Sequence, residues 1–199
     1  MEHYYSRKQT SEESVKAVEA VFGDREFIFM TSSGVFSRNF VDFGSRLLIE
    51  TVMNEDLPGS PRILDIGCGY GPVGIVLAAS KGDSTVEMTD INERAVKLAR
   101  ENIELNDISN AKVSVSDSFG SINGKYDVIV TNPPIRAGKS IVYGFFEGAY
   151  GKLNEGGCFY CVIQKKQGAD SAERKLSELF GNCSLIARKS GYRILKSCR

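Results

Sequence analysis

The stretch Ile63-Leu64-Asp65-Ile66-Gly67-Cys68-Gly69-Tyr70-Gly71-Pro72 decides the fold of this chain. Its first four residues predict a buried strand, and the glycines that follow predict a sharp loop that leads into a helix. Backbone without a Cβ can approach a ligand closely, and a helix N-terminus favours negative charge. A dinucleotide-binding fingerprint needs glycine at the sixth position of this loop, where the chain has Pro72.

Outward from this loop, short β-branched runs alternate with longer segments of helical period, which is typical of a parallel sheet wrapped by helices. The sequence therefore predicts a doubly wound α/β fold. The last two predicted strands are separated only by residues 189–191, so we expect an antiparallel hairpin at one edge of the sheet. Strands are predicted at Arg62–Ile66, Thr85–Thr89, Lys112–Val115, Tyr126–Thr131, Cys158–Gln164, Ser184–Arg188 and Tyr192–Lys196, and helices at Gly71–Ser80, Asn92–Asn106, Ser140–Leu153 and Asp170–Phe180.

Residues 1–60 form an extension before this core of residues 61–199. Residues 10–22 are predicted to form an amphipathic helix, Phe27–Thr31 a strand and Asp42–Met53 a second helix. Neither a linker nor a repeat separates the extension from the core, so we expect a single domain over residues 1–199.

The overall composition excludes several classes of protein. The chain has 199 residues, of which 42% are hydrophobic, too many for a disordered segment. Its 25 Lys and Arg residues balance 25 Asp and Glu residues, which excludes a histone-like basic protein and an acidic tail protein. The last quarter differs, because residues 160–199 carry 9 basic and 3 acidic side chains, a local sum of +6. This excess is either a footprint for a polyanion or the solvated face of ordinary helices and strands.

Cysteine usage and hydropathy indicate a cytoplasmic protein. No run approaches the ~20 apolar residues of a membrane span, and the polar N-terminus lacks the apolar run of a signal peptide. The five cysteines are odd in number and scattered, so we expect reduced thiols. Cys158 and Cys161 resemble a metal or redox pair, but residues three apart on a strand point to opposite faces.

Two further carboxylates follow strands of the predicted sheet. Asp90 ends the second strand, where it can accept hydrogen bonds from both hydroxyls of a ribose held by the glycine loop. Asp117 follows the third strand, beside an aromatic residue, and can accept from an adenine amino group. Single acids at such positions also cap helices and turns, which is the alternative for each.

The fourth strand runs into Asn132, Pro133 and Pro134. Two prolines stiffen the loop and remove two backbone donors, so carbonyl groups and the Asn132 amide are left to point outward. Such a loop can grip a planar –NH2 group, with the Asn132 oxygen and the Pro133 carbonyl accepting its two hydrogens. An unrelated turn is the alternative use of the same residues.

The glycine loop, the spaced acids and the Asn-Pro-Pro loop together resemble the class I S-adenosylmethionine-dependent methyltransferases. That resemblance implies a Rossmann-like, seven-stranded sheet of order 3-2-1-4-5-7-6, with the last strand antiparallel and helices on both faces. It also implies that S-adenosylmethionine is the cofactor. By resemblance, Asp65, Gly67, Gly69 and Gly71 cradle its methionine part, Asp90 the ribose and Asp117 the adenine, while Asn132, Pro133 and Pro134 hold the methyl acceptor.

Within this class the chain looks most like the small-domain methyltransferases related to the 16S ribosomal RNA guanine-N2 enzymes. The closer likeness is carried by residues 34–37 and 42–44 before the core, residues 135–139 after the prolines and residues 164–168 after the fifth strand. The residue after the prolines is often aromatic in amino-methylating relatives, where it stacks on a base, and here it is Ile135. Stacking must then come from elsewhere, such as Phe36, or the acceptor differs.

The resemblance implies methyl transfer to an exocyclic amino nitrogen of RNA, and guanine N2 of ribosomal RNA is the expected acceptor. Arg136, Lys139, Lys165 and Lys166 are the candidate contacts to RNA phosphates, with a solvated rim as the alternative. Lys165 and Lys166 alternate faces if the strand continues, so at most one of them should face the pocket. The chemistry needs no metal, and the only histidine, His3, is terminal and not expected to be a base.

Three other functions stay open at this level. A protein glutamine side chain presents the same two donors to the Asn-Pro-Pro loop, and adenine N6 in nucleic acid is another amino acceptor. A non-catalytic RNA- or ligand-binding module is the alternative from a different class, although the intact motifs argue against it. The sequence carries no signal for an oligomeric state.

Overall fold

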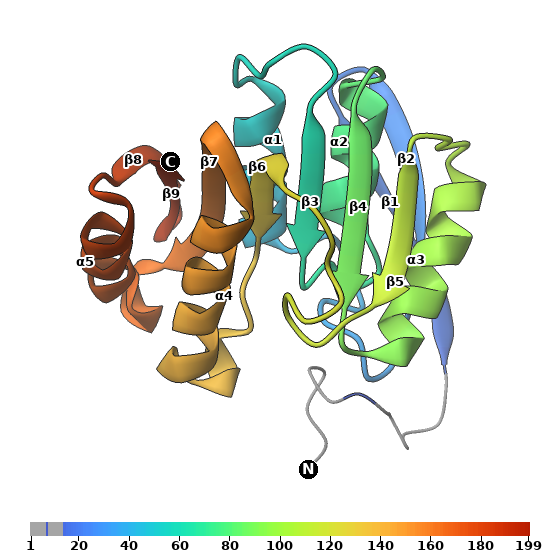
Figure 1. Ribbon diagram of the computed structural model, residues 1–199. Coiled ribbons are helices and arrows are strands. Elements are labelled where there is room, and N and C mark those ends of the chain that lie inside the picture. The colour runs from blue at the N-terminus through green and yellow to red at the C-terminus, as the bar shows by residue number, and fades with distance from the viewer. Residues whose placement is uncertain (1–6, 8–13) are drawn as a thin grey trace.

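A seven-stranded sheet forms the centre of the molecule, and the computed structural model describes residue 7 and residues 14–199 (Figure 1). The strands are β3 (Arg62–Ile66), β4 (Thr85–Asp90), β5 (Ala111–Val115), β6 (Tyr126–Thr131), β7 (Leu153–Gln164), β8 (Ser184–Lys189) and β9 (Tyr192–Cys198). Their order is β5-β4-β3-β6-β7-β9-β8, and β9 runs antiparallel to both of its neighbours. The predicted order 3-2-1-4-5-7-6 with an antiparallel last strand is confirmed.

Helices cover both faces of this sheet (Figure 1). The α-helices are α1 (Phe43–Met53), α2 (Pro72–Ser80), α3 (Glu93–Leu105), α4 (Lys139–Lys152) and α5 (Ala169–Phe180), and two short 3-10 turns are η1 (Ile135–Ala137) and η2 (Lys165–Gln167). Along β6, Val128 and Val130 pack into the core that α1, α2 and α3 share, while Ile129 packs into the core of α4 and α5. This strict alternation in a strand buried on both faces explains its continuous apolar sequence.

An antiparallel hairpin, β1 (Val15–Phe22) and β2 (Arg25–Ser32), precedes the sheet. The prediction of a helix over residues 10–22 is therefore wrong from residue 15 onward, and residues 10–13 lie outside the described residues, as does His3. Val18, Ala20 and Phe22 are buried at a period of two, so the apolar positions match a strand better than a helix. A two-residue turn with Gly23 at φ +56° closes the hairpin.

Two asparagines of α3 attach this hairpin to the domain. The side-chain amide of Asn102 accepts from the backbone N–H of Met30 at 2.6 Å and donates to its carbonyl at 2.9 Å. One helical turn later, Asn106 makes the same pair of bonds with Ile28, at 3.1 and 2.8 Å. The two amides satisfy backbone groups that an edge strand otherwise leaves unpaired, so the hairpin is held against α3.

The helix predicted from Asp42 is confirmed, and its start is capped as the sequence indicates. Asp42 precedes α1 and its Oδ1 accepts from the backbone N–H groups of Gly44 and Ser45, at 3.0 and 3.1 Å. α1 packs against α2 and β7, which brings its first turn beside the end of β6.

The cysteines differ from expectation in one respect. The register of β7 and β9 sets Cys158 opposite Cys198, and the structure joins them in a disulfide. Reduced thiols were expected throughout; the pairing depends on two strands 40 residues apart, so sequence spacing could not reveal it. Cys68, Cys161 and Cys183 are free. Cys158 and Cys161 pack on different core clusters, which confirms that they face opposite sides of β7.

No helix in the described part of the chain is long and apolar enough to cross a membrane.

Candidate active site

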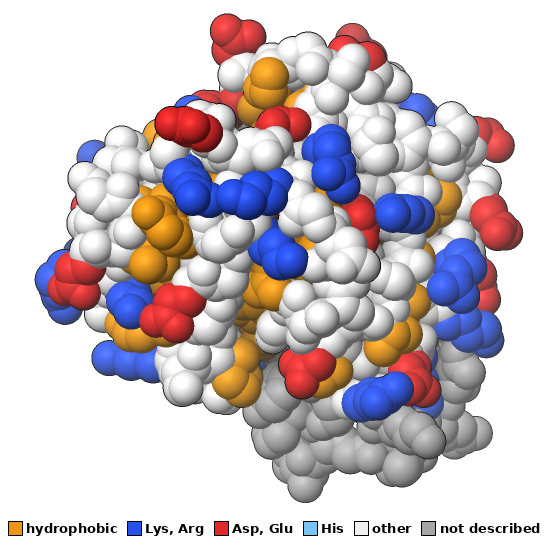
Figure 2. Space-filling model, in the orientation of Figure 1, with side chains coloured by type: hydrophobic (Ala, Val, Ile, Leu, Met, Phe, Trp, Pro, Cys, Tyr) orange, Lys and Arg blue, Asp and Glu red, His pale blue; other side chains and the backbone are white. Residues whose placement is uncertain are grey.

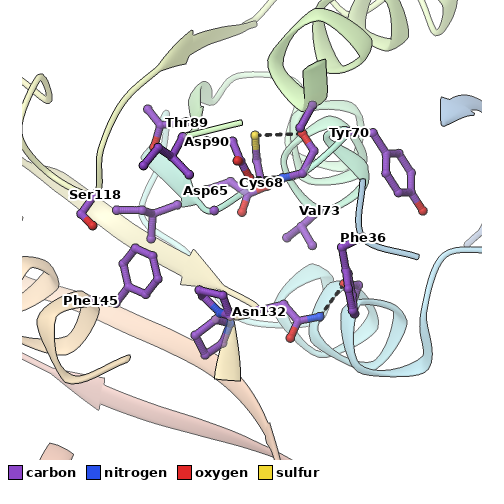
Figure 3. Close-up of a pocket in the computed structure, with 18 of the residues that line it drawn as sticks. Phe36, Asp65, Cys68, Tyr70, Val73, Thr89, Asp90, Ser118, Asn132 and Phe145 are labelled. Atoms are coloured by element: carbon purple, nitrogen blue, oxygen red, sulfur yellow. Dashed lines mark hydrogen bonds between the residues drawn. The ribbon is translucent and has the colours of Figure 1, made fainter. Parts of the chain in front are cut away.

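A pocket opens at the carboxyl ends of the central parallel strands, where β3, β4, β5 and β6 run into their loops. Figure 3 shows Asp65, Cys68 and Asp90 on one side of this pocket, and Phe36 and Asn132 on the other. The pocket is lined by Val35, Phe36, Asp42, Ser45, Asp65, Ile66, Gly67, Cys68, Gly69, Tyr70, Pro72, Val73, Thr89, Asp90, Ile91, Ala95, Ser116, Asp117, Ser118, Asn132, Pro133, Pro134, Ala137, Ile141 and Phe145.

The glycine loop forms the floor of the pocket. The backbone N–H groups of Gly67 and Cys68 both donate to the Thr89 carbonyl, at 2.8 and 2.9 Å, which ties the loop to the end of β4. Gly69 has φ +58°, and a Cβ built on it meets no protein atom within 4 Å. Because that space is open, the bare backbone of the loop is available to a ligand.

Asp65 lies beneath the loop, with only 1% of its surface exposed. Its Oδ2 accepts from the backbone N–H of Gly74 in α2 at 2.9 Å. The pKa of this carboxyl is raised from 3.8 to about 7, because burial, and to a smaller extent nearby Asp90, raises it by more than the Gly74 bond lowers it. A positively charged ligand group in the pocket would favour the ionised form of Asp65.

Asp90 faces the same pocket from the end of β4. Its Oδ2 accepts from the N–H of Gly69 and its Oδ1 from the N–H of Asn92, both at 2.8 Å. Burial raises the pKa of this carboxyl, and the backbone bonds oppose that rise. Each oxygen keeps a further lone pair, so the side chain is held in place and can still accept from a diol.

The open space above Gly69 and the remaining lone pairs of Asp90 fit S-adenosylmethionine. Thr89 also lines the pocket, but its hydroxyl is buried and has no hydrogen-bond partner among the described residues. Asp117 is exposed at the pocket between Ser116 and Ser118, on the loop that follows β5.

Asn132 lies at the opposite side of the pocket, directly after β6. Its Nδ2 donates to Ser45 Oγ at 3.0 Å and to the Asp42 carboxylate at 3.3 and 3.5 Å. A carboxylate oxygen only accepts hydrogen bonds, so the amide nitrogen must face Asp42. The amide oxygen, Oδ1, is therefore left to accept from a molecule in the pocket.

The carbonyl groups of the two prolines were expected to be free, but both accept hydrogen bonds within the loop. The Pro133 carbonyl accepts from the N–H of Ile135, and the Pro134 carbonyl from the N–H of Ala137, both at 2.8 Å. These bonds start η1 and keep the loop rigid. Each carbonyl retains one lone pair.

Several predicted site residues do not line the pocket. Gly71, at φ +94°, begins α2, and a Cβ there would lie 3.0 Å from Ile75 and 3.3 Å from Ala99. It allows α2 and α3 to approach each other. Ile135 packs against the core of α4 and α5 rather than lining the pocket.

The predicted basic contacts are exposed and lie outside the pocket wall. Arg136 is in η1 and Lys139 begins α4, so they flank Ala137 and Ile141, which do line it. Lys165 begins η2, and its backbone N–H donates to Gly191 in the β8–β9 turn at 2.7 Å.

Sequence reasoning missed Asp42 and Ser45 as pocket residues. The signal was present, since Asp42 was predicted to start a helix, but a cap was the complete explanation for it. Tyr70 and Phe145 were also missed as parts of the wall. Among the described residues, no cluster of three or more His, Cys, Asp or Glu side chains can hold a metal ion.

Comparison with known proteins decides the family. The family model described as "Methyltransferase small domain" matches residues 26–196. The chain belongs to that family. The expectation of a methyltransferase that uses S-adenosylmethionine is confirmed for this domain.

The relatives of this small-domain methyltransferase fall into two groups. YbxB of Bacillus subtilis is 46% identical over 198 residues, which are 98% of each chain. Ribosomal RNA small subunit methyltransferase C of Vibrio parahaemolyticus is 34% identical over 140 residues, which are 70% of this chain and 40% of that protein. The same enzyme of Vibrio cholerae is 30% identical over 187 residues, which are 92% of this chain and 53% of that protein. The chain thus spans about half, or less, of these ribosomal RNA enzymes.

Among solved structures, the 16S rRNA N2 guanine methyltransferase RsmC of T. thermophilus, in complex with AdoMet and guanosine, has a TM-score of 0.83 to this methyltransferase. The two share 27% sequence identity, and the match covers 93% of this chain and 50% of that one.

Proposed function

We propose that this methyltransferase transfers a methyl group to an exocyclic amino nitrogen of RNA, and that the acceptor is guanine N2 of ribosomal RNA. The observation that carries the choice of an amino acceptor is the orientation of Asn132. Its amide nitrogen faces the accepting groups of Asp42 and Ser45, so Oδ1 faces the substrate side.

The chain offers two acceptors to one amino group. Asn132 Oδ1 takes one hydrogen, and the second lone pair of the Pro133 carbonyl takes the other. A hydroxyl acceptor has a single hydrogen and would leave one of these oxygens unpaired. Holding both N–H bonds aims the nitrogen lone pair and favours the pyramidal nitrogen that attack on carbon requires.

The cofactor is assigned to the other side of the pocket. S-Adenosylmethionine supplies a methyl group on a positively charged sulfonium sulfur. We assign the methionine part to the glycine loop and Asp65, the ribose to Asp90 and the adenine to Asp117. Gly71 supports the loop from behind. After transfer, the acceptor nitrogen releases its proton to water at the pocket mouth, and no side chain of the pocket is required as a base.

The relatives support RNA as the substrate. Two of them are ribosomal RNA small subunit methyltransferases, and the T. thermophilus neighbour is a guanine-N2 enzyme. Phe36 lines the pocket with 42% of its surface exposed, and we assign it the stacking contact that Ile135 does not provide. Arg136, Lys139 and Lys165 remain our candidates for phosphate contacts. With ribosomal RNA as the substrate, we expect the protein to act in the cytoplasm.

The test is transfer of radiolabelled methyl from S-adenosylmethionine to an extract depleted of this protein. The labelled product is divided and digested with nuclease or with protease, and nuclease-released label is resolved into nucleosides. We expect nuclease-sensitive label that migrates as N2-methylguanosine. An Asn132→Ala variant serves as the control, because it keeps the donor side of the pocket.

Other outcomes would replace the proposal. Protease-sensitive label would indicate a protein glutamine acceptor, and label in N6-methyladenosine would indicate adenine. Binding of S-adenosylmethionine without any transfer would favour a binding module.

A further inference from the structure

We propose that the β8–β9 turn and the neighbouring η2 form a phosphate-binding surface for the RNA on either side of the methylated base. The surface consists of Lys165, Lys166, Arg188 and Lys189, which we call the hairpin-turn cluster. This inference rests on the proposed function, and it adds two residues, Arg188 and Lys189, to the rim predicted from sequence.

The charge of the C-terminal quarter locates this surface. Within residues 160–199, Lys175 is paired with Glu147, Arg193 with Asp170 and Glu173, and Lys196 with Glu55. Arg199 donates to the Leu153 carbonyl. The four members of the hairpin-turn cluster are exposed, and none of them forms a salt bridge within the described residues. Four of the nine basic residues of this quarter thus belong to the hairpin-turn cluster, and Arg174, on α5, is a further exposed residue outside it without a salt bridge among the described residues.

Backbone contacts bring the cluster together. Lys165 begins η2, and its N–H donates to Gly191 at 2.7 Å, so η2 lies against the turn that follows Lys189. The backbone of Lys165 and Lys166 is therefore next to the turn that follows Arg188 and Lys189. The side chains of Arg188 and Lys189 point to opposite faces of the edge strand β8, so the cluster surrounds this end of the hairpin.

A short chain of contacts joins the cluster to the acceptor side of the pocket. The Lys189 ammonium lies 6.0 Å from the centre of the Phe43 ring, and the Phe43 and Tyr192 rings are 5.5 Å apart. Phe43 directly follows Asp42, whose carboxylate accepts from the Asn132 amide. A nucleic acid whose base enters the pocket beside Asn132 therefore has its backbone within reach of the cluster.

A second group of basic side chains is less suited to this role. Figure 2 shows Lys and Arg gathered over the part of the face where β3, β6 and β7 begin, opposite the carboxyl ends that carry the pocket. Arg62 lies over the Tyr126 ring at 4.9 Å, and Lys152 donates to the Ile122 carbonyl at 2.5 Å. Arg62 and Lys152, which lie at the start of β3 and directly before β7, are thus already engaged by the protein.

RNA is the partner that fits the cluster. A nucleic-acid backbone carries one phosphate per nucleotide, so it can pair with several unpaired cations beside a pocket that accepts a base. Salt dependence measures such contacts, since each phosphate contact contributes roughly 0.7–0.9 to the slope of log affinity against log salt.

The test compares two triple variants with equal change in charge. One carries Lys166→Ala, Arg188→Ala and Lys189→Ala; the control carries Lys97→Ala, Lys125→Ala and Arg174→Ala, which are exposed on other surfaces. The probe is deproteinised small-subunit ribosomal RNA, with affinity measured at several salt concentrations. Methyl transfer to that RNA and to guanosine nucleoside is measured beside it. Lys189 also contacts Phe43, so a Lys166→Glu, Arg188→Glu double variant that leaves this contact is tested in parallel.

We expect the cluster variant to lose affinity for the RNA by about tenfold or more, with a salt slope smaller by roughly 2. Transfer to guanosine, binding of S-adenosylmethionine and the melting temperature should match the wild type, and the control should bind RNA normally. The phosphate-binding proposal would be wrong if both cluster variants bound RNA with the affinity and salt slope of the wild type. It would also be wrong if the control variant lost as much affinity as the cluster variant. Neither result would contradict RNA methylation by the wild type. Both proposals would be wrong if the wild-type protein bound S-adenosylmethionine but neither bound nor methylated RNA. If the methyl label appeared in protein instead, and the cluster variants reduced it, the surface would be assigned to an acidic polypeptide and the RNA proposal would be wrong.

Discussion

Burial of Asp65 should make the folded protein less stable as the pH rises. The carboxyl is 1% exposed, and its pKa is raised from 3.8 to about 7, with burial as the largest cause. Between these values the folded state holds a proton that the unfolded chain has released. The stability from this proton is fully present below pH 3.8 and is lost as the pH rises through about 7. A shift of about three units corresponds to roughly 4 kcal/mol as an upper value.

The perturbation is Asp65→Asn, and the assay is urea unfolding between pH 5 and 8. The asparagine keeps an oxygen for the Gly74 N–H but does not ionise. Relative to this variant, the wild type should lose about 1.4 kcal/mol of unfolding free energy per pH unit, or roughly 2–3 kcal/mol from pH 5 to 7. Asp83→Asn, at an exposed carboxylate, should follow the wild type. Parallel curves for the wild type and Asp65→Asn would refute the reasoning.

The same proton should control cofactor affinity. A positively charged ligand beside Asp65 favours the ionised carboxylate, so binding releases the proton below pH 7. The affinity of the wild type for S-adenosylmethionine should therefore rise by up to about tenfold per pH unit below pH 7 and then level off. Calorimetry at pH 5.5, 6.5 and 7.5 measures this, and a flat profile would contradict the assignment of Asp65 to the cofactor.

Three further predictions concern packing and the acceptor side. Gly74→Ala should lower the free energy of unfolding, measured with urea, by about 1–3 kcal/mol, because the new Cβ would lie 2.3 Å from Met88 Sδ. Gly144→Ala should raise it by about 0.5–1 kcal/mol, because this position is helical and the space around it is open. Ser45→Ala removes the 3.0 Å partner of the Asn132 amide and should lower kcat about tenfold without changing the KM for S-adenosylmethionine; an equal change in both would assign Ser45 a general structural role. Asn132→Ala should abolish methyl transfer in the labelling assay while cofactor binding in calorimetry stays nearly intact, and loss of both would contradict the division of the pocket.

The fold was predictable because its signals are local. Strands buried on both faces have short, continuous apolar sequences. The loop at Gly67 and Gly69 indicates where the first strand ends and the helix that follows it begins. The helix expected over residues 10–22 was wrong from residue 15 onward because the period of two at Val18, Ala20 and Phe22 was missed, and pairing with β2 fixes this segment as a strand. The Cys158–Cys198 pair likewise depends on strand register.

The position of the glycine-loop residues was predicted better than the contacts of Asn132. Asp65 and Asp90 lie near the carboxyl ends of the neighbouring parallel strands β3 and β4, so their meeting at one edge of the sheet follows from topology. Asp42 and Ser45 meet Asn132 across almost 90 residues of chain, and no local pattern predicts that contact. The grouping of Lys189 with Lys165 depends in the same way on a backbone bond between distant segments.

Asp42 links the start of a helix to the orientation of a side chain in the pocket. One carboxylate starts α1 and also orients the Asn132 amide in the pocket. In the proposed function, the donor half of the pocket is encoded by residues 65–117, whereas the acceptor half is completed by a segment of the extension. A chimaera that exchanges residues 35–45 with another family member would therefore keep its affinity for the cofactor and change the choice of acceptor. The extension is, in this sense, the interchangeable part of the enzyme.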